Sequence, residues 1–282
     1  MKTSLKSELL KARKGGYAIP AFNFDDLEMM KGIVEAAEEE KSPVILMVTE
    51  SAAKYMGIDY VFALGKTVVE KSTVPIVLHW DHGFDLNLIK KACDAGFTSV
   101  MLDASKETFE VNVKQTQEIV AYAKSKGVEV ESEIGHVGGK EDDRTSEGNG
   151  YTNIDEAVEF VKKTNIDALA IAVGTAHGVY KGAIKLQYDI ITNIASKVDT
   201  PLVLHGSSGV PLEDLQKAIK CGITKINIGT DLKMANANAF RNWLNENPTG
   251  YDARAFGRKG IDAVKSEAKK KIRAFGSSNK SA

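Results

Sequence analysis

The chain contains little cysteine, no excess of charge of either sign and no long apolar segment. Its 282 residues include two cysteines, Cys93 and Cys221, and 37 basic against 38 acidic side chains, for a net charge of −1. Two cysteines cannot form the disulfide framework of a small secreted scaffold, so we expect free thiols and a cytoplasmic protein. The balanced charge excludes a global attraction to nucleic acid or to anionic membranes. No apolar run approaches the roughly 20 residues of a membrane-spanning helix, so we expect no membrane partner.

Two lysine-rich segments need a separate interpretation. Residues 1–13 mix Lys and Ser with Leu and contain no uninterrupted apolar core, so we expect no signal peptide. Residues 265–273 place Ala268 and Ile272 at helical spacing among basic side chains. This pattern is typical of a solvated helix face rather than of a nucleic-acid-binding patch.

Short apolar runs alternate with amphipathic segments along the whole chain, which is the pattern of a parallel sheet. The expected strands are residues 17–22, 43–48, 75–80, 98–102, 128–133, 167–173, 201–205 and 223–228. Eight such units predict a (β/α)8 barrel, one domain spanning residues 1–282, with its active site at the C-terminal ends of the strands. A doubly wound open sheet is the competing fold, but the turn after the first strand lacks the Gly-x-Gly-x-x-Gly pattern.

Histidine is rare, and its placement indicates a metal site. Of five histidines, four lie at or beside predicted strand ends that also carry glycine. His82, His177 and His205 come from three separate strands, which predicts a catalytic zinc site with coordination positions left for substrate. We expect His79, inside its strand, to be a core residue and His136, on a polar loop, to face solvent.

Carboxylates accompany the predicted metal site. Asp103, Glu131 and Glu133 lie at the ends of the fourth and fifth strands, where they could orient imidazoles or hold a second cation. Asp81 is adjacent to His82 and is one candidate proton shuttle. Glu141 is the other, because it lies in a polar stretch, residues 135–151, which is long enough to be a mobile active-site element. The alternative for Glu141 is that it belongs to a solvated acidic loop.

Two glycine-containing loops predict a phosphate site. Residues 206–211 follow the seventh strand and residues 227–231 follow the eighth, and each leads into a helix. Backbone N–H groups and the helix dipole favour an anion there. Metal and phosphate together point to carbonyl chemistry on a sugar phosphate, in which zinc stabilises an enediolate without a Schiff base. We expect Lys225 of the eighth strand to face a helix or the rim.

With these residues in hand, the chain resembles the class II, zinc-dependent ketose-bisphosphate aldolases over nearly its whole length. The motifs are His79-Trp-Asp-His-Gly83, Glu131-Ser-Glu-Ile-Gly135, Gly138-Gly-Lys-Glu-Asp142, Ala176-His-Gly-Val-Tyr180, His205-Gly-Ser-Ser-Gly-Val-Pro211 and Asn227-Ile-Gly-Thr-Asp231. The resemblance implies reversible cleavage of fructose or tagatose 1,6-bisphosphate to dihydroxyacetone phosphate and glyceraldehyde 3-phosphate. It also implies a homodimer or homotetramer.

The resemblance implies a role for each matching residue. The zinc ligands are His82, His177 and His205, while Asp103, Glu131 and Glu133 belong to alternative or second metal positions. Asp81 is the proton donor at the aldehyde oxygen, and Glu141 exchanges the proton at carbon. The residues that contact substrate, often with a monovalent cation (Na⁺ or K⁺), are Asn23, Gly178, Gly206, Ser207, Ser208, Asn227, Ile228, Gly229 and Thr230.

Alternatives remain open at this point. A metal-dependent isomerase or epimerase of sugar phosphates uses the same enediolate, and a barrel that only binds a sugar phosphate is a third hypothesis. Gly229 occupies a position where many fructose-specific members carry Asp, so the sugar, or another phosphorylated ketose, is undecided. Arg254 could contact a second phosphate or be an ordinary surface arginine.

Overall fold

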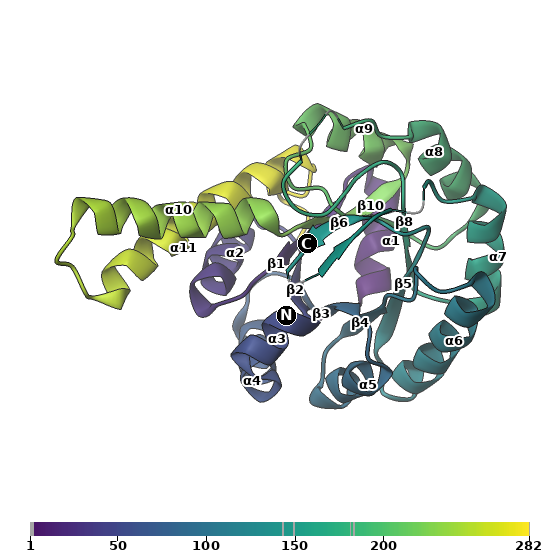
Figure 1. Cartoon of the computed structure of the whole chain (residues 1–282), viewed down its shortest axis with the longest axis horizontal. Helices are drawn as coiled ribbons and strands as arrows, with labels where there is room; N and C mark the ends of the chain where they lie inside the picture. The colour runs from purple at the N-terminus through teal and green to yellow at the C-terminus, as the bar shows by residue number, and fades with distance from the viewer. Residues whose placement is uncertain (1–2, 143, 149, 181, 183, 282) are drawn as a thin grey trace.

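Eight parallel strands close into a barrel in the computed structural model (Figure 1). They are β1 (Ile19–Asn23), β2 (Val44–Thr49), β3 (Ile76–Gly83), β4 (Ser99–Leu102), β5 (Glu129–Ile134), β8 (Ala168–Ile171), β9 (Leu202–Leu204) and β10 (Ile223–Ile228). The first strand pairs with the last, with Phe22 opposite Ile228, so the sheet has no open edge. This closure confirms the predicted (β/α)8 barrel and excludes the doubly wound sheet. The structure describes residues 3–142, 144–148, 150–180, 182 and 184–281, and of Glu141 only the backbone.

Helices surround the strands, as Figure 1 shows. They are α1 (Leu5–Gly15), α2 (Leu27–Glu39), α3 (Glu50–Met56), α4 (Ile58–Lys71), α5 (Leu86–Ala95), α6 (Phe109–Ser125), α7 (Ile154–Thr164), α8 (Tyr188–Lys197), α9 (Leu212–Cys221), α10 (Thr230–Glu246) and α11 (Ala253–Ala274). Several begin at a side chain that accepts free backbone N–H groups, such as Asp26, Asp85 and Asn153. These caps explain why the helices start shortly after the strands end.

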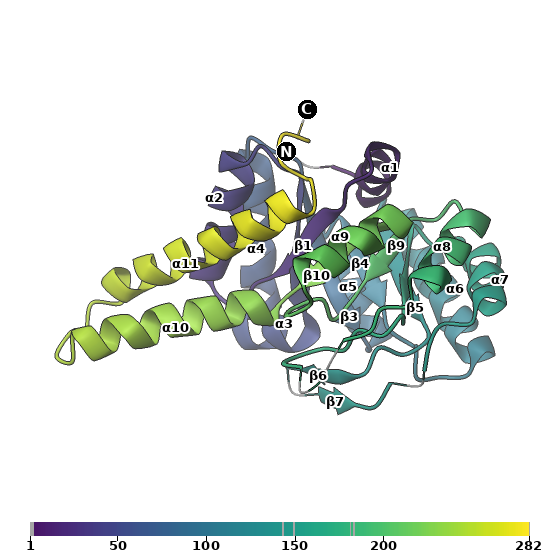
Figure 2. The same ribbon diagram turned by 90° about the horizontal axis from the view of Figure 1, so that it is seen from above.

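The first helix closes one end of the barrel. Leu5, Leu9 and Ala12 of α1 are fully buried against apolar side chains that point into the barrel, such as Ile45 and Val77. At the opposite end lies a small antiparallel hairpin, β6 (Gly139–Glu141) and β7 (Arg144–Ser146). Figure 2 shows α1 and this hairpin on opposite sides of the molecule. The closed, apolar end leaves the C-terminal ends of the strands as the open, polar mouth.

Helices α10 and α11 form an antiparallel arm that extends away from the barrel (Figures 1 and 2). Near the barrel, the basic side chains of α11 form ion pairs with acidic side chains of α2 and of its C-terminal cap, among them Lys269 with Glu39 at 2.7 Å and Arg273 with Glu40 at 2.7 Å. Lys271 is buried and pairs with Asp231. The prediction of a simply solvated face for residues 265–273 is therefore wrong in part, because this face packs against an acidic neighbour.

Neither cysteine takes part in a disulfide. Cys93 is buried and Cys221 is partly buried, and both are free thiols. Burial raises the pKa of the Cys93 thiol to about 11. In the described ranges, no helix combines the length and the apolar character needed to cross a bilayer.

Candidate active site and metal centre

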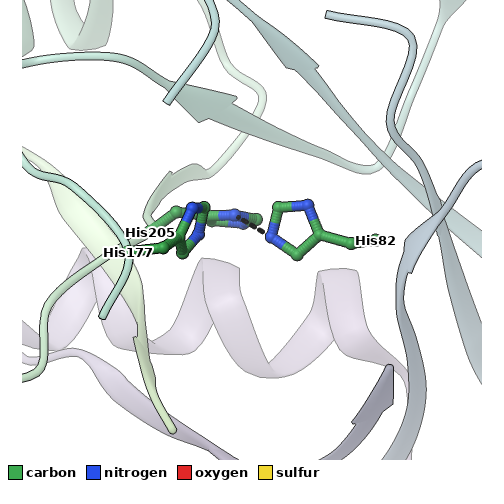
Figure 3. Close-up of side chains that lie close together, drawn as sticks. All are labelled: His82, His177 and His205. Atoms are coloured by element: carbon green, nitrogen blue, oxygen red, sulfur yellow. Dashed lines mark hydrogen bonds between the residues drawn. The ribbon is translucent and has the colours of Figure 1, made fainter. Parts of the chain in front are cut away.

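Three histidines from separate parts of the sequence meet at the mouth of the barrel (Figure 3). His82 ends β3, His177 follows β8 and His205 follows β9. Their ring centroids are 4.6 Å apart for His82 and His205, 5.0 Å for His82 and His177, and 5.9 Å for His177 and His205. One ligand nitrogen from each ring lies within 4.8 Å of the others. These are the three residues that the sequence predicted as a metal triad, and the fold brings all three together.

A local irregularity of β3 turns His82 towards this cluster. In a regular strand Asp81 and His82 would point to opposite faces. The register between β3 and β4 shifts between Trp80 and Gly83, and His82 has a φ of 43°. A bulge of this kind re-aims a side chain, and it allows both Asp81 and His82 to face the mouth. Trp80 before the bulge is fully buried on the helix side.

Carboxylates orient two of the three imidazoles. Nδ1 of His82 lies 2.9 Å from Oδ2 of Asp103, and Nε2 of His205 lies 2.9 Å from Oε1 of Glu131. Each carboxylate can accept the ring proton, which leaves Nε2 of His82 and Nδ1 of His205 without one. These two nitrogens face one another at 2.8 Å. Their lone pairs would repel each other, and a cation between them would remove that repulsion, so the donor set fits a metal ion.

The electrostatics keep these imidazoles in the form that a metal needs. Burial lowers the pKa of His177 to about 3 and that of His205 well below its usual value. Both rings are therefore neutral at pH 7. Burial alone would raise the pKa of Asp103, but the hydrogen bonds from His82 and Ser105 lower it below the usual range. The site thus combines neutral nitrogen donors with an ionised carboxylate, as zinc sites do.

The other two predicted metal carboxylates have different surroundings. Glu133 lies with Asp103 and His136 in a second group whose ligand atoms are within 4.8 Å of one another. Burial and the charge of Asp103 raise the pKa of Glu133 well above its usual value. Glu131 belongs to neither group, and instead contacts His205 and, at 2.9 Å, the ammonium of Lys225.

The prediction for Lys225 is wrong. Instead of facing a helix or the rim, Lys225 is fully buried inside the barrel and paired with Glu131. A side chain on β10 must point either to the helices or into the barrel, and the buried carboxylate makes the second position favourable. An ammonium held in this pair is not a free amine, which agrees with the expectation that no Schiff base is used.

Asp81 is held beside the metal ligands by two asparagines. Its Oδ2 accepts a hydrogen bond from Asn23 at 2.8 Å, and its Oδ1 accepts one from Asn227 at 3.4 Å. Asp81 is almost completely buried. The three side chains come from β3, β1 and β10, so the barrel itself fixes the carboxylate in place.

A cavity of about 680 Å³ lies next to the histidines. It is lined by His177 and by most of the residues predicted to bind substrate, namely Asn23, Gly178, Gly206, Ser207, Ser208, Asn227, Gly229 and Thr230. Ile228 is not among the lining residues and is fully buried in β10. Gly229 directly precedes α10, so backbone N–H groups at a helix N-terminus border the cavity, an arrangement that suits an anion.

Close backbone contacts require glycine at two of these positions. Gly178 has a φ of 87°, and a Cβ there would lie 2.8 Å from the carbonyl oxygen of Lys140. Gly206 has a φ of 62°, and a Cβ there would lie 2.6 Å from the backbone of Ala176. Gly206 thus lets the His205 loop pack directly on the His177 loop, and Gly178 lets the His177 loop pack on the β6–β7 hairpin.

The polar stretch predicted to be a mobile element is anchored in this structure. Asp142, at the tip of the β6–β7 hairpin, accepts hydrogen bonds from Thr49 at 2.5 Å, Ser51 at 2.8 Å and Lys233 at 2.6 Å. Burial alone would raise the pKa of Asp142, but Lys233 and the two hydroxyls lower it. The side chain of Glu141 lies outside the described residues. Its neighbour Asp142 is not a solvated acidic residue.

The remaining histidines had opposite outcomes. His79 is buried inside the barrel with Nδ1 2.6 Å from the hydroxyl of Ser99, which confirms a core residue. His136 was expected to face solvent, and this prediction is wrong, because its ring is only 7% exposed and contacts Ser105 and Ser146. A polar loop that folds back over the mouth buries side chains that its composition places in solvent.

Among the lining residues that were not predicted, Thr49 and Lys233 lie outside every motif and loop that the sequence singled out. Lys233 lies one helical turn after Thr230, so the spacing within 227–233 could have indicated it. Thr49 ends β2, a strand that carries no histidine or glycine signal. Arg254 lies on the arm, 91% exposed at its side chain and paired with Asp252, and it does not line the cavity.

Comparison with known proteins agrees with this geometry. A model of the family described as fructose-bisphosphate aldolase class-II matches residues 3–280. The chain is 47% identical over 282 residues to the fructose-bisphosphate aldolase of Geobacillus stearothermophilus, covering 99% of this chain and 98% of that protein. It is 44% identical to that of Staphylococcus aureus strain Mu50, covering 98% of both. The crystal structure of the YdjI aldolase from Escherichia coli K12 superposes with a TM-score of 0.90 at 35% identity, covering 100% of both chains. The chain belongs to the class II fructose-bisphosphate aldolase family.

Proposed function

We propose that this protein catalyses the zinc-dependent, reversible aldol cleavage of a ketose 1,6-bisphosphate, either fructose or tagatose 1,6-bisphosphate. The products are dihydroxyacetone phosphate and glyceraldehyde 3-phosphate. The observation that carries the proposal is the meeting of His82, His177 and His205 beside a cavity that also reaches Asn23, Asn227 and two glycine-containing loops. Family membership supports the reaction class.

In the proposed enzyme, the three imidazoles hold Zn²⁺, which when bound polarises the ketose carbonyl and stabilises the negative charge that develops on its oxygen. Glu131 holds His205, and Asp103 holds His82, in the orientation that presents a lone pair. Asp103, Glu131 and Glu133 are the carboxylates proposed for alternative or second metal positions, and Asp103 and Glu133 lie in one group of possible ligands. A monovalent cation, Na⁺ or K⁺, near the phosphate loops is a further proposal that rests on the resemblance alone.

Asp81 is the proposed proton carrier at the oxygen of the aldehyde half. It takes the proton from the hydroxyl group as the carbon–carbon bond breaks and returns it during synthesis. The hydrogen bonds from Asn23 and Asn227 orient this carboxylate. Glu141 is the proposed group that exchanges the proton at carbon, and its place on the hairpin beside Gly178 suits that role.

The phosphate of the dihydroxyacetone half is proposed to bind between Gly178, the loop of Gly206, Ser207 and Ser208, and residues 227–230. Gly178 and Gly206 lie in turns with positive φ, and Gly229 and Thr230 lie at the start of α10. Backbone N–H groups at such positions are good hydrogen-bond donors to an anion. Gly229 leaves room beside Asn23, since a Cβ there would lie 2.9 Å from Oδ1 of Asn23.

A comparison of two sugars tests the proposal. Chelator-treated protein is reconstituted with zinc and supplied with fructose or tagatose 1,6-bisphosphate, and triose phosphate is measured with a coupled reductase. We expect triose phosphate only after zinc is restored, and none from a His177→Ala control. Interconversion of sugar phosphates without triose release would favour an isomerase or epimerase instead. Tight binding without any turnover would favour a binding protein.

We also propose a homodimer or homotetramer and a cytoplasmic location. The α10–α11 arm supports self-association, because it extends from the barrel and exposes Met234, Leu244 and Tyr251. Light scattering after size exclusion would give the mass, and a 30.5 kDa species would contradict the oligomer.

A further inference from the structure

His136 joins two segments that are separated in the sequence, the loop after β4 and strand β7 of the hairpin. It follows β5, and each of its ring nitrogens contacts a different serine. Nδ1 lies 2.8 Å from the hydroxyl of Ser105, after β4, and Nε2 lies 2.8 Å from the hydroxyl of Ser146, in β7. The ring therefore bridges the barrel mouth and the hairpin.

The hydrogen bonds around this ring have one direction. The Ser105 hydroxyl donates to Oδ1 of Asp103 at 2.6 Å, so its oxygen accepts from the Nδ1–H group of His136. Because Nδ1 carries the proton of the neutral ring, Nε2 accepts a hydrogen bond from the Ser146 hydroxyl. The other oxygen of Asp103 accepts from Nδ1 of His82. A continuous series of hydrogen bonds thus runs from β7 to a residue of the histidine triad.

The far end of the series is the hairpin that carries Glu141. Ser146 pairs with Gly139 across the hairpin, and Glu141 pairs with Arg144 at the other end of the same short ladder. Because the hairpin has only three residues in each strand, a displacement of Ser146 would displace the whole ladder. The backbone of His177 gives a second connection, through Gly138 and Lys140.

We propose that His136 is a positioning residue that couples the β6–β7 hairpin to His82, so that metal binding and the placement of the hairpin depend on one another. The inference rests on the proposed zinc-dependent function. Coupling of this kind is reciprocal, because a metal that holds His82 also fixes Asp103, Ser105 and His136. The hairpin is then ordered over the cavity when the metal is present.

Direct metal ligation by His136 is the competing role. Its Nδ1 lies near Asp103 and Glu133 in the second group of possible ligands. The ring is turned towards Ser105, however, with Nδ1 2.8 Å from that hydroxyl and 3.8 Å from Oε1 of Glu133. A protonated Nδ1 cannot ligate a metal, which favours the bridging role.

Three substitutions of His136 separate the two hydrogen bonds. His136→Phe keeps the ring and removes both bonds, His136→Asn can restore a donor near Nδ1, and His136→Gln can restore an acceptor near Nε2. Ser146→Ala removes only the hydrogen bond on the hairpin side, and Ser125→Ala, on an exposed helix end, is the matched control.

Each full-length protein is digested with trypsin with and without zinc, and the rate of cleavage after Lys140 and Arg144 is measured by mass spectrometry. Zinc affinity and metal content are measured in parallel by competition with a chelating dye.

In the unsubstituted protein and in Ser125→Ala, we expect zinc to slow cleavage of the hairpin about tenfold, as one or two coupled hydrogen bonds allow. In His136→Phe and Ser146→Ala this protection falls to about twofold, carried by His177, while sites elsewhere are cleaved as before. We expect His136→Asn to keep the zinc affinity of the unsubstituted protein, and His136→Gln to keep its slow cleavage of the hairpin in the presence of zinc.

Full protection by zinc in both His136→Phe and Ser146→Ala would overturn the proposal. So would the loss of one bound metal equivalent in His136→Phe, because His136 would then be a ligand. These measurements do not use turnover, so an inactive protein would refute the proposed aldolase function and leave this test intact.

Discussion

The two ends of the barrel bury side chains of opposite character. At the N-terminal end, Leu5 and Leu9 of α1 close the barrel with apolar contacts alone. At the C-terminal end, the buried groups include His205, Glu131 and Glu133, all with no exposed surface. The apolar end stabilises the fold without demanding a particular orientation of its groups. The polar end buries groups whose desolvation costs free energy unless partners or a cation compensate. Stability and chemistry are thus supplied by different ends of one barrel.

The largest effect on activity is expected when a histidine of the triad is removed from the polar end. His177→Ala should remove bound zinc and turnover together, because two imidazoles and water cannot replace the third ligand. Metal content by atomic absorption and the triose phosphate assay check this outcome. Lys270→Ala, an exposed side chain on α11, is the control. Full activity in a zinc-free His177→Ala protein would refute the metal assignment.

At the apolar end, the same kind of truncation should change stability and leave chemistry alone. Leu9→Ala should reduce the free energy of unfolding by about 2–5 kcal/mol, since it leaves a cavity in a fully buried contact. The neighbouring Leu10 is 41% exposed, so Leu10→Ala is a matched control that should cost less than about 0.5 kcal/mol. Urea unfolding gives both values. A fall in activity per folded molecule for Leu9→Ala would contradict the division between the two ends.

Acidification should lower the stability of the metal-free protein through the buried histidines of the polar end. The pKa of His177 is about 3 in the folded state, and those of His79 and His205 are also lowered by burial. Unfolded histidines take up protons below about pH 6.5, so the unfolded state binds more protons and stability falls as the pH falls. Each such histidine contributes up to about 1.4 kcal/mol per pH unit. Unfolding at pH 7, 6 and 5 measures the change in the free energy of unfolding with pH, which should be the same in Leu9→Ala. A free energy of unfolding that does not change with pH would contradict the neutral, buried state of these histidines.

A smaller effect is expected at the hairpin that covers the polar end. Asp142→Asn keeps the size of the side chain but removes the charge that pairs with Lys233. Hydrogen exchange of the hairpin amides should become about fivefold faster, in line with the loss of one charge-assisted hydrogen bond. Asp155→Asn, an exposed ion-pair partner on α7, is the control. Unchanged exchange would show that the His136–Ser146 hydrogen bond and the backbone bonds to His177 suffice to hold the hairpin.

The smallest effect is expected outside both ends, on the α2–α11 face. Lys269→Ala should reduce the free energy of unfolding by less than about 1 kcal/mol, since Glu39 is half exposed and the pair is screened by solvent. Unfolding in low and high salt measures it. A cost above that of Leu9→Ala would mean that this face contributes more than ordinary surface ion pairs do.

Much of the fold and of the candidate site could be predicted because both follow local patterns. Apolar runs bounded by turn residues located all eight strands, and a residue at the end of such a run must lie at the mouth. His82, His177 and His205 were therefore predictable as neighbours without any knowledge of their separation. The phosphate loops were predictable for the same reason, since glycine and a helix start are visible in the sequence.

Errors arose where a side chain's surroundings come from another segment. His136 looked exposed because its own loop is polar, yet Ser105 and Ser146 enclose it. Lys225 looked like a rim residue because a lone lysine in a strand has no visible partner, and Glu131 lies 94 residues away. The solvated acidic loop that was the alternative for Glu141 does not describe its neighbour Asp142, which Thr49, Ser51 and Lys233 contact across the mouth.

The sequence by itself determined the barrel, the triad and the anion loops, because strand periodicity and strand ends are properties of adjacent residues. Only the tertiary structure decided which carboxylate orients which imidazole, where the hairpin is anchored and how His136 connects them. Those choices depend on distances between segments far apart in the chain, and no local pattern encodes them.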